Sequence, residues 1–367
     1  MKRVYVWTLP TRIFHWLFVA LILGAWISVQ EDRWLNIHAA IGSAVGVLVL
    51  FRIVWGGMGP KYSRFGDFNL SFDALKEYLI SLLNPSRRYI GHNPAASFVM
   101  LAMLITVVLA VFSGTLAYGV AENRGLLAFL HSGLFRDMEI FEEIHEFFVN
   151  LLWVLIAAHV GGVLVDRFMH KEDRTLTSII DGHKNMDGES AVLSWYQKIL
   201  ALIGIGGAIA LLIYTLSTPN NPIITGYNQK VDYAKINPVF VNECGSCHTL
   251  YPPTLLAKEG WNRLMGDLSN HFGDDASLDP ADEQSMREYL LAHSAETSTQ
   301  EMSLKMMQSL EKRDMIAITQ TPFWKKRHHH ISEEIFKSDK VKSRANCKAC
   351  HGDVEQGTIE DNAIKAL

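Results

Sequence analysis

The feature that most constrains this chain is an apolar stretch, Phe141 to Val165, that carries two histidines. In an α-helix, the fourteen residues from His145 to His159 rise about 21 Å and return to within about 40° of one face. The two imidazoles would therefore lie on one stripe, near opposite edges of a bilayer core about 30 Å thick. Ionisable residues inside a membrane helix are costly, so the pair indicates two stacked ligand sites. Haem iron accepts an axial imidazole between helices, whereas hydrogen bonds to neighbouring helices are the alternative interpretation.

Five apolar stretches are long enough to cross a membrane. We expect them at Ile13–Val29, Ile37–Trp55, Ala95–Val120, Phe141–Val165 and Trp195–Leu216. The first is predicted to be a retained signal anchor, and an amphipathic helix at Phe72–Leu83 is predicted to lie along the membrane surface. Lys and Arg concentrate at the N-terminus and in the second and fourth connections. The positive-inside rule thus places the N-terminus in the cytoplasm and all residues after Leu216 in the periplasm.

Depth then pairs the histidines of the membrane part. His15 and His159 fall on the cytoplasmic side, whereas His38 and His145 fall on the periplasmic side. Each pair would hold one haem b with both axial positions filled, which favours electron transfer over oxygen binding. Small residues follow these histidines, with Gly42 one turn after His38, and would allow the close approach that a flat macrocycle needs. Three arginines on the basic side are candidates for contacts with haem propionates: Arg12, Arg52 and Arg167.

All four cysteines lie after the last apolar stretch, in two Cys-x-x-Cys-His motifs. The motifs are Cys244, Cys247 and His248, and then Cys347, Cys350 and His351. This pattern is the attachment site of a c-type haem, whose adjacent histidine supplies one axial ligand. Zinc is the alternative, but it would have to join pairs almost a hundred residues apart and ignore both histidines. The periplasmic location agrees with covalent haem attachment, and the net charge of −4 gives no reason to expect nucleic acid binding.

Each covalent haem needs a sixth ligand. For the first haem we predict His271, with Met265 and His293 as alternatives. For the second haem the candidates are three consecutive histidines, of which one would bind iron: His328, His329 and His330. The basic run that leads into them could instead be only a solvated face.

Two family resemblances cover most of the chain. Residues 1 to about 185 resemble the bacterial cytochrome b-561 family, which includes the b-type subunits of nickel–iron hydrogenases. The matching segments are WTLPTRIFHW, HAAIG, FRIVWG and HEFFVNLLWVLIAAH. This resemblance implies a four-helix dihaem bundle that exchanges electrons with quinone, with His15, His38, His145 and His159 as iron ligands.

Residues of about 230 to 360 resemble the dihaem cytochrome c family called DHC. The matching segments are ECGSCHTLYPPTLL, HFGDDASLD, TPFWKKRH and VKSRANCKACHGDVEQG. The resemblance implies bis-histidine ligation of both haems and favours His328 over His330 as the ligand of the second. It also implies a small periplasmic haem protein as redox partner and an association with a membrane cytochrome b.

The sequence thus predicts an all-α protein of the bacterial inner membrane. We expect a four-helix bundle with two b haems over residues 1–185, a fifth spanning helix and linker over 186–226, and a mainly helical periplasmic domain with two c haems over 227–367. The predicted function is electron transfer between quinone and a periplasmic redox protein, as a possible quinol oxidoreductase. One alternative is a membrane anchor that delivers electrons from a periplasmic dehydrogenase or hydrogenase to quinone. Another is a haem-based sensor, which would need an open coordination position.

Overall fold

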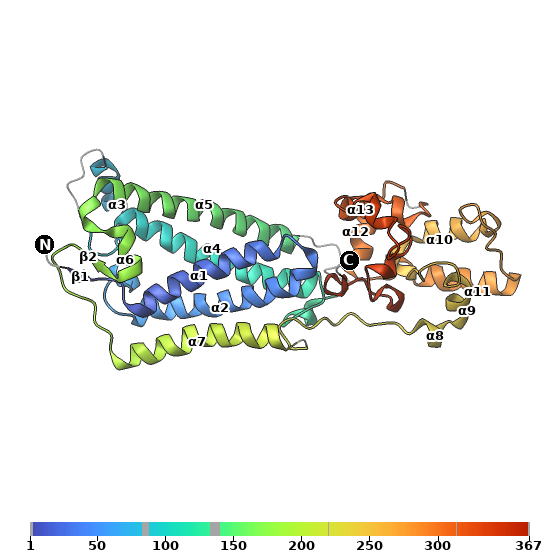
Figure 1. The fold of residues 1–367 in the computed structure, drawn as a ribbon, viewed down its shortest axis with the longest axis horizontal. Helices are drawn as coiled ribbons and strands as arrows, with labels where there is room; N and C mark the ends of the chain where they lie inside the picture. Colours follow the sequence, from blue (N-terminus) through green and yellow to red (C-terminus); the bar gives the residue numbers. More distant parts are fainter. Residues whose placement is uncertain (1–2, 83–87, 133–139, 219, 313, 366–367) are drawn as a thin grey trace. The chain divides into compact units, whose positions relative to one another are not determined.

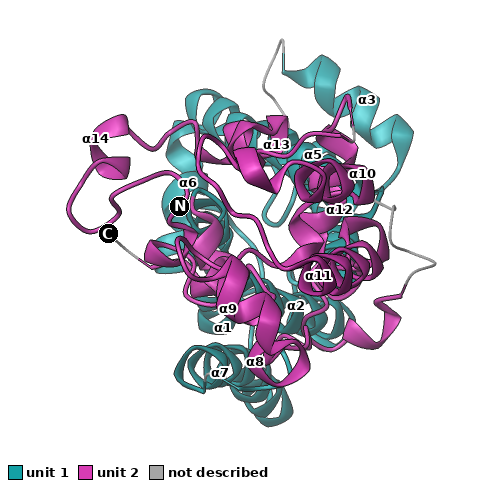
Figure 2. Cartoon of the chain, turned by 90° about the vertical axis from the view of Figure 1, so that its right-hand side faces the viewer, with its two compact units in different colours: residues 1–30, 36–117, 139–225 teal, residues 31–35, 118–138, 226–367 magenta. Residues whose placement is uncertain are grey.

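The structure is a computed structural model that describes residues 3–82, 88–132, 140–218, 220–312 and 314–365. These residues are mostly helical, and the two strands found among them form one small sheet. The chain divides into two compact units (Figure 2). Unit 1 comprises Met1–Gln30, Asn36–Ala117 and Glu139–Thr225, and unit 2 comprises Glu31–Leu35, Tyr118–Met138 and Gly226–Leu367.

Among the described residues, five helices are long and apolar enough to cross a membrane, and unit 1 is built on them (Figure 1). They are α1 (Leu9–Ser28), α2 (Leu35–Met58), α4 (Pro94–Val120), α5 (Ile140–Met169) and α7 (Trp195–Ser217). The five predicted spans are therefore confirmed. Helix α1 begins four residues before Ile13, because Pro10 fits the first turn of a helix, where its missing N–H is not needed.

The apolar side chains of these helices are of two kinds, those buried between helices and those that point outward. Leu48, Val107 and Leu152 are buried in a core shared by α2, α4 and α5. Leu50, Phe147 and Leu202 point outward and are 64%, 61% and 74% exposed. Large apolar side chains that face outward in such numbers fit a lipid surrounding, in which they lose nothing by exposure.

Four further elements of unit 1 gather at the end where α1 and α4 begin (Figure 1). They are β1 (Val4–Tyr5), β2 (His183–Lys184), α3 (Phe72–Ser81) and α6 (Thr175–Asp181). Strands β1 and β2 pair antiparallel, with Val4 opposite Lys184. The amphipathic helix predicted from Phe72 is present as α3, and Leu83, its predicted last residue, lies outside the described residues. We call this end of unit 1, where those four elements lie, the basic end.

Unit 2 consists of short helices joined by loops and 3-10 turns. Its helices are α8 (Tyr233–Ile236), α9 (Pro238–Cys244), α10 (Lys258–Met265), α11 (Pro280–Ala292), α12 (Glu301–Ser309), α13 (Pro322–His328) and α14 (Glu333–Phe336). Phe240, Leu256 and Leu290 are almost fully buried at the centre of its core. Short helices cannot bury an apolar face alone, so this unit depends on packing between its elements.

Asp361 gives unit 2 a pH dependence of its stability. Burial, together with the nearby carboxylate of Glu301, raises the pKa of this carboxyl to about 6. A raised pKa stabilises the fold fully below about pH 4, and this stabilisation is lost as the pH rises through about 6. The free energy of unfolding of unit 2 should therefore change less between pH 4.5 and 7 in Asp361→Asn than in the parent protein, by about 1–2 kcal/mol. The measurement is denaturant unfolding of the full chain in detergent at pH 4.5, 5.5 and 7, with unit 2 followed by its covalent haems.

Asp275→Asn is the contrasting variant for this experiment. Hydrogen bonds from Ser277 lower the pKa of Asp275, so its contribution has the opposite sign and is lost as the pH falls. If Asp361→Asn and the parent protein have the same slope between pH 4.5 and 7, the burial assigned to Asp361 is wrong.

Candidate haem sites

His38 on α2 and His145 on α5 face each other inside unit 1. Their ring centroids lie 6.2 Å apart, with the ring planes at 82°. The Nδ1 atom of His38 lies 3.0 Å from the carbonyl oxygen of Ala25, and that of His145 lies 2.9 Å from the carbonyl oxygen of Ala110. A carbonyl only accepts, so each Nδ1 carries the proton and donates it. Each Nε2 is then an unprotonated nitrogen that can bind a metal.

The separation of these rings fits one metal ion between them. Two imidazole nitrogens, each about 2 Å from one ion and about 1 Å from its own ring centroid, place the centroids about 6 Å apart. Space for a flat group is also present beside His38, because a Cβ added at Gly42 would meet no heavy atom within 4 Å. The residues therefore fit a haem held by two axial imidazoles.

Gly114 on α4 was missed by the sequence reasoning. A Cβ at this position would lie 2.8 Å from Nδ1 and Cε1 of His145. Gly114 follows Ala110 by one turn, so one segment of α4 supplies both the carbonyl acceptor and the space for the imidazole. A glycine inside a long apolar helix, where it costs about 1 kcal/mol relative to alanine, was the signal that could have revealed it.

His15 on α1 and His159 on α5 form the second pair of unit 1. They lie within electrostatic range of each other, toward the basic end. The Nδ1 atom of His15 is buried and has no hydrogen-bond partner within the chain. The edge of its ring meets Trp16, at a centroid distance of 5.1 Å. The two histidines that the sequence analysis paired are thus near enough to interact electrostatically.

The three predicted arginines differ in their surroundings. Arg12 lies one turn before His15, and its Nε is buried without a partner, while its guanidinium donates to the carbonyl of Ile180. Arg52 is half-buried, and its Nη1 donates to the carbonyl of Ser63 at 3.3 Å. Arg167 is exposed on the last turn of α5. Arg12 thus keeps one buried donor that a propionate could use.

In unit 2 the first Cys-x-x-Cys-His motif follows α9, whose last residue is Cys244. The rings of His248 and His271 are stacked at a centroid distance of 6.2 Å and an interplanar angle of 20°. His271 reaches this position from a tight turn, because Phe272 and Gly273 both have positive φ angles. Of the two alternatives, Met265 is buried in the core and His293 is exposed beside Tyr289.

The second motif brings His351 opposite His328, at a centroid distance of 6.1 Å. His328 stacks on Trp324 at 4.4 Å, and its Nδ1 donates to the carbonyl of Trp324 at 2.9 Å. His329 and His330 are exposed and lie side by side, 5.6 Å apart. The helix α13 therefore presents only the first histidine of the run to the motif.

The lowered pKa values of three histidines in unit 2 favour metal ligation. Burial lowers the pKa of His351 to about 4, and it also lowers the pKa values of His271 and His328. These imidazoles are therefore neutral at neutral pH, which is the form that binds metal. Burial raises the pKa of the Cys244 and Cys347 thiols to about 11, which argues against a redox role as reactive thiolates.

The two cysteine motifs lie next to each other, although they are far apart in the sequence. The Oγ1 of Thr249, which follows His248, lies 3.3 Å from Oδ1 of Asn346, which precedes Cys347. The hydroxyl of Tyr251 donates to the carbonyl of Ala345 at 2.6 Å. Groups attached at the two motifs would thus be neighbours within unit 2.

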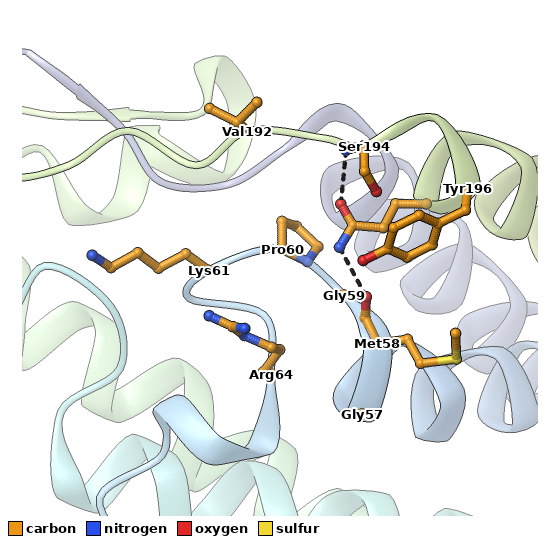
Figure 3. A pocket seen from close by; sticks show the side chains of 10 residues that line it. Gly57, Met58, Gly59, Pro60, Lys61, Arg64, Val192, Ser194 and Tyr196 are labelled. Carbon is orange, nitrogen blue, oxygen red and sulfur yellow. Dashed lines mark hydrogen bonds between the residues drawn. The ribbon is translucent and has the colours of Figure 1, made fainter.

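A pocket of about 410 Å³ lies between the end of α2 and the start of α7 (Figure 3). The amide of Gln197 joins the two helices there, since it accepts from the backbone N–H of Ser194 and donates to the carbonyl of Met58. Lys61 at its rim is paired with Glu189 at 2.7 Å. None of the predicted haem ligands lines this pocket.

In comparisons with known proteins, two separate parts of the chain match two different families. Residues 6–182 match the model of the prokaryotic cytochrome b561 family, and residues 240–359 match that of the dihaem cytochrome c family. A probable Ni/Fe-hydrogenase B-type cytochrome subunit from Rhizobium leguminosarum bv. viciae is 24% identical over 50% of this chain and 89% of its own length. A probable Ni/Fe-hydrogenase 1 B-type cytochrome subunit from Escherichia coli strain K12 is 26% identical over 49% of this chain and 90% of its own.

Two solved structures are similar in sequence to about a third of the chain. A diheme cytochrome c from Rhodobacter sphaeroides is 35% identical, covering 35% of this chain and 98% of its own, with a TM-score of 0.30. A diheme cytochrome type c from Shewanella baltica OS155 is 32% identical, covering 35% of this chain and 91% of its own, with a TM-score of 0.29.

The three consecutive histidines that begin at the last residue of α13 provide an internal control. We expect His328→Ala to leave the covalent haem at Cys347 without its second axial ligand, because only His328 faces His351. One of the two covalent haems should then become high-spin in the absorption and EPR spectra of the oxidised protein. His329→Ala and His330→Ala should leave both haems low-spin. A high-spin signal in His330→Ala, with none in His328→Ala, would reverse the assignment.

Proposed function

Because residues 6–182 belong to the prokaryotic cytochrome b561 family and residues 240–359 to the dihaem cytochrome c family, we propose that this membrane electron-transfer cytochrome connects quinone to a periplasmic redox protein. Electrons would pass through two b haems in unit 1 and two c haems in unit 2. The chain would lie in a bacterial inner membrane with its N-terminus in the cytoplasm, as the distribution of Lys and Arg favours. Unit 2 would then lie in the periplasm.

The observation that carries this proposal is a repeated geometry. Three pairs of histidine rings oppose each other at 6.1–6.2 Å, and each pair comes from two separate elements. The proposed ligands are His38 with His145, His248 with His271, and His351 with His328, and His15 with His159 is the fourth pair. Covalent attachment would use Cys244, Cys247, Cys347 and Cys350. A sensor needs an open coordination position, which paired imidazoles do not leave.

A haem with two axial imidazoles supplies reversible one-electron transfer. The residues of the chain hold that group in place. The carbonyls of Ala25, Ala110 and Trp324 fix the ring orientation of three of the ligands. The contact between Thr249 and Asn346 keeps the two attachment motifs together, so that electrons can move within unit 2.

The second candidate function reverses the direction of electron flow. The chain would then anchor a periplasmic dehydrogenase or hydrogenase and deliver its electrons to quinone. The similarity to subunits named as Ni/Fe-hydrogenase B-type cytochromes favours this version. The resemblance of residues 240–359 to the dihaem cytochrome c family implies a small periplasmic haem protein as the partner instead.

Rapid mixing of the purified full chain with a water-soluble quinol tests the proposal. We expect the c haems to become reduced, and we expect His145→Ala to slow this reduction at least tenfold, because electrons would have to pass the site of His38 and His145. His131→Ala is the matched control, since this histidine lies outside the four pairs. Reduction of the c haems by quinol at the parent rate in His145→Ala would contradict the route. Faster quinone reduction by a periplasmic donor would support the second candidate.

A further inference from the structure

Two nitrogen-bearing side chains share one aromatic ring at the basic end. The guanidinium carbon of Arg52 lies 5.9 Å from the centroid of Phe68, and the ring of His92 lies 5.0 Å from the same centroid. Trp7 contacts His92 at 4.7 Å. His92 is therefore held between Trp7 and Phe68, and Arg52 packs on the same phenyl ring.

Lys184 adds a third nitrogen-bearing side chain beside Arg52 and His92. Its side chain is only 4% exposed, and its Nζ donates to the carbonyls of Tyr89 at 3.2 Å and Gly91 at 3.4 Å. Gly91 is the residue before His92, so the ammonium group lies along the segment that carries the imidazole. An ammonium group has three donors, and these two bonds leave one for another acceptor.

The acidic residues near Lys184 already have partners. Lys184 lies within electrostatic range of Asp166 and Asp173. Asp166 is bonded to the imidazole of His170 at 3.1 Å, and Asp173 is paired with Arg88 at 3.2 Å. The cluster of Arg52, His92 and Lys184 therefore keeps an excess of donors and positive charge.

His92 itself has an unfilled hydrogen-bond position. Its Nδ1 is buried and has no partner within the chain. Burial, together with the charges of Arg52 and Lys184, lowers the pKa of His92 to about 3. A buried polar atom without a partner costs about 1–3 kcal/mol, so an orphaned nitrogen beside two cations points to a missing anionic ligand.

The anion is identified by what lies next to the cluster. His92 is within electrostatic range of His159, which is one of the two proposed ligands of the haem at this end. A haem held there would bring its own carboxylates, and they are the anionic groups that a bis-imidazole site introduces into a membrane bundle. Carboxylates bind most strongly to charged donors with several N–H groups, which Arg52 and Lys184 supply.

We propose that Arg52, His92 and Lys184 form the carboxylate-binding end of the site of His15 and His159, and that they hold a haem propionate. This inference rests on the proposed haem ligation. It adds two residues, His92 and Lys184, that the sequence reasoning did not single out. Trp7 and Phe68 would keep the imidazole turned toward the carboxylate, so His92 acts as a positioning residue for the haem.

The test uses the full chain and two substitutions. His92→Phe keeps a ring between Trp7 and Phe68 but removes the nitrogen, and Lys184→Met removes the ammonium group while keeping an unbranched side chain. Loss of a donor leaves the propionate charge less compensated, which favours ferric haem. We expect each variant to lower the ratio of reduced to oxidised haem at fixed potential about tenfold, for one b haem only. His183→Phe is the matched control, because His183 packs on Tyr5 outside the cluster.

Redox-difference infrared spectroscopy gives a second readout, which observes the propionate carboxylates directly and does not depend on the redox potential of the haem. With haem labelled at the propionate carboxylates by carbon-13, we expect the labelled bands of one b haem to shift in His92→Phe and to remain in place in His183→Phe. Unchanged bands and an unchanged potential in both His92→Phe and Lys184→Met would overturn the inference. A b haem that persists unaltered in His15→Ala and in His159→Ala would instead contradict the proposed ligation, so the two failures can be told apart.

Discussion

A backbone carbonyl that accepts a hydrogen bond from imidazole Nδ1 is the interaction on which three of the four proposed sites depend. It recurs at His38, His145, His248 and His328, with distances of 2.7–3.0 Å. The bond fixes the tautomer, so that Nε2 is left as the ligand nitrogen, and it also fixes the direction in which the ring points. In unit 1 the carbonyls come from the neighbouring helices α1 and α4, so the packing of the bundle sets the geometry of the site.

The same bond reduces the cost of placing histidines inside an apolar bundle. A buried polar group without a partner would destabilise the unit by about 1–3 kcal/mol. Ala110 satisfies one nitrogen of His145, and a metal would satisfy the other. Two of the buried histidine nitrogens without a partner, Nδ1 of His15 and Nδ1 of His92, lie toward the basic end, where a ligand with carboxylates would meet them.

Much of the architecture could be predicted from the sequence, because long apolar stretches and Cys-x-x-Cys-His motifs are local patterns. The five spans needed only the length of the apolar stretches, and the pairing of His38 with His145 needed helix geometry and the distribution of Lys and Arg. The first of the three histidines after Trp324 was favoured by a family resemblance, and the structure shows why it differs: it alone turns inward from α13.

The contacts between distant segments could not be predicted. Gly114 makes room for His145, Thr249 meets Asn346 across 97 residues, and His92 joins Arg52 through Phe68. Each depends on how elements pack, which no local pattern encodes.

A pyridine haemochrome spectrum of the full chain tests the account most directly. It should show two b and two c haems per chain, whereas a single c haem, or no b haem, would contradict the paired-histidine sites.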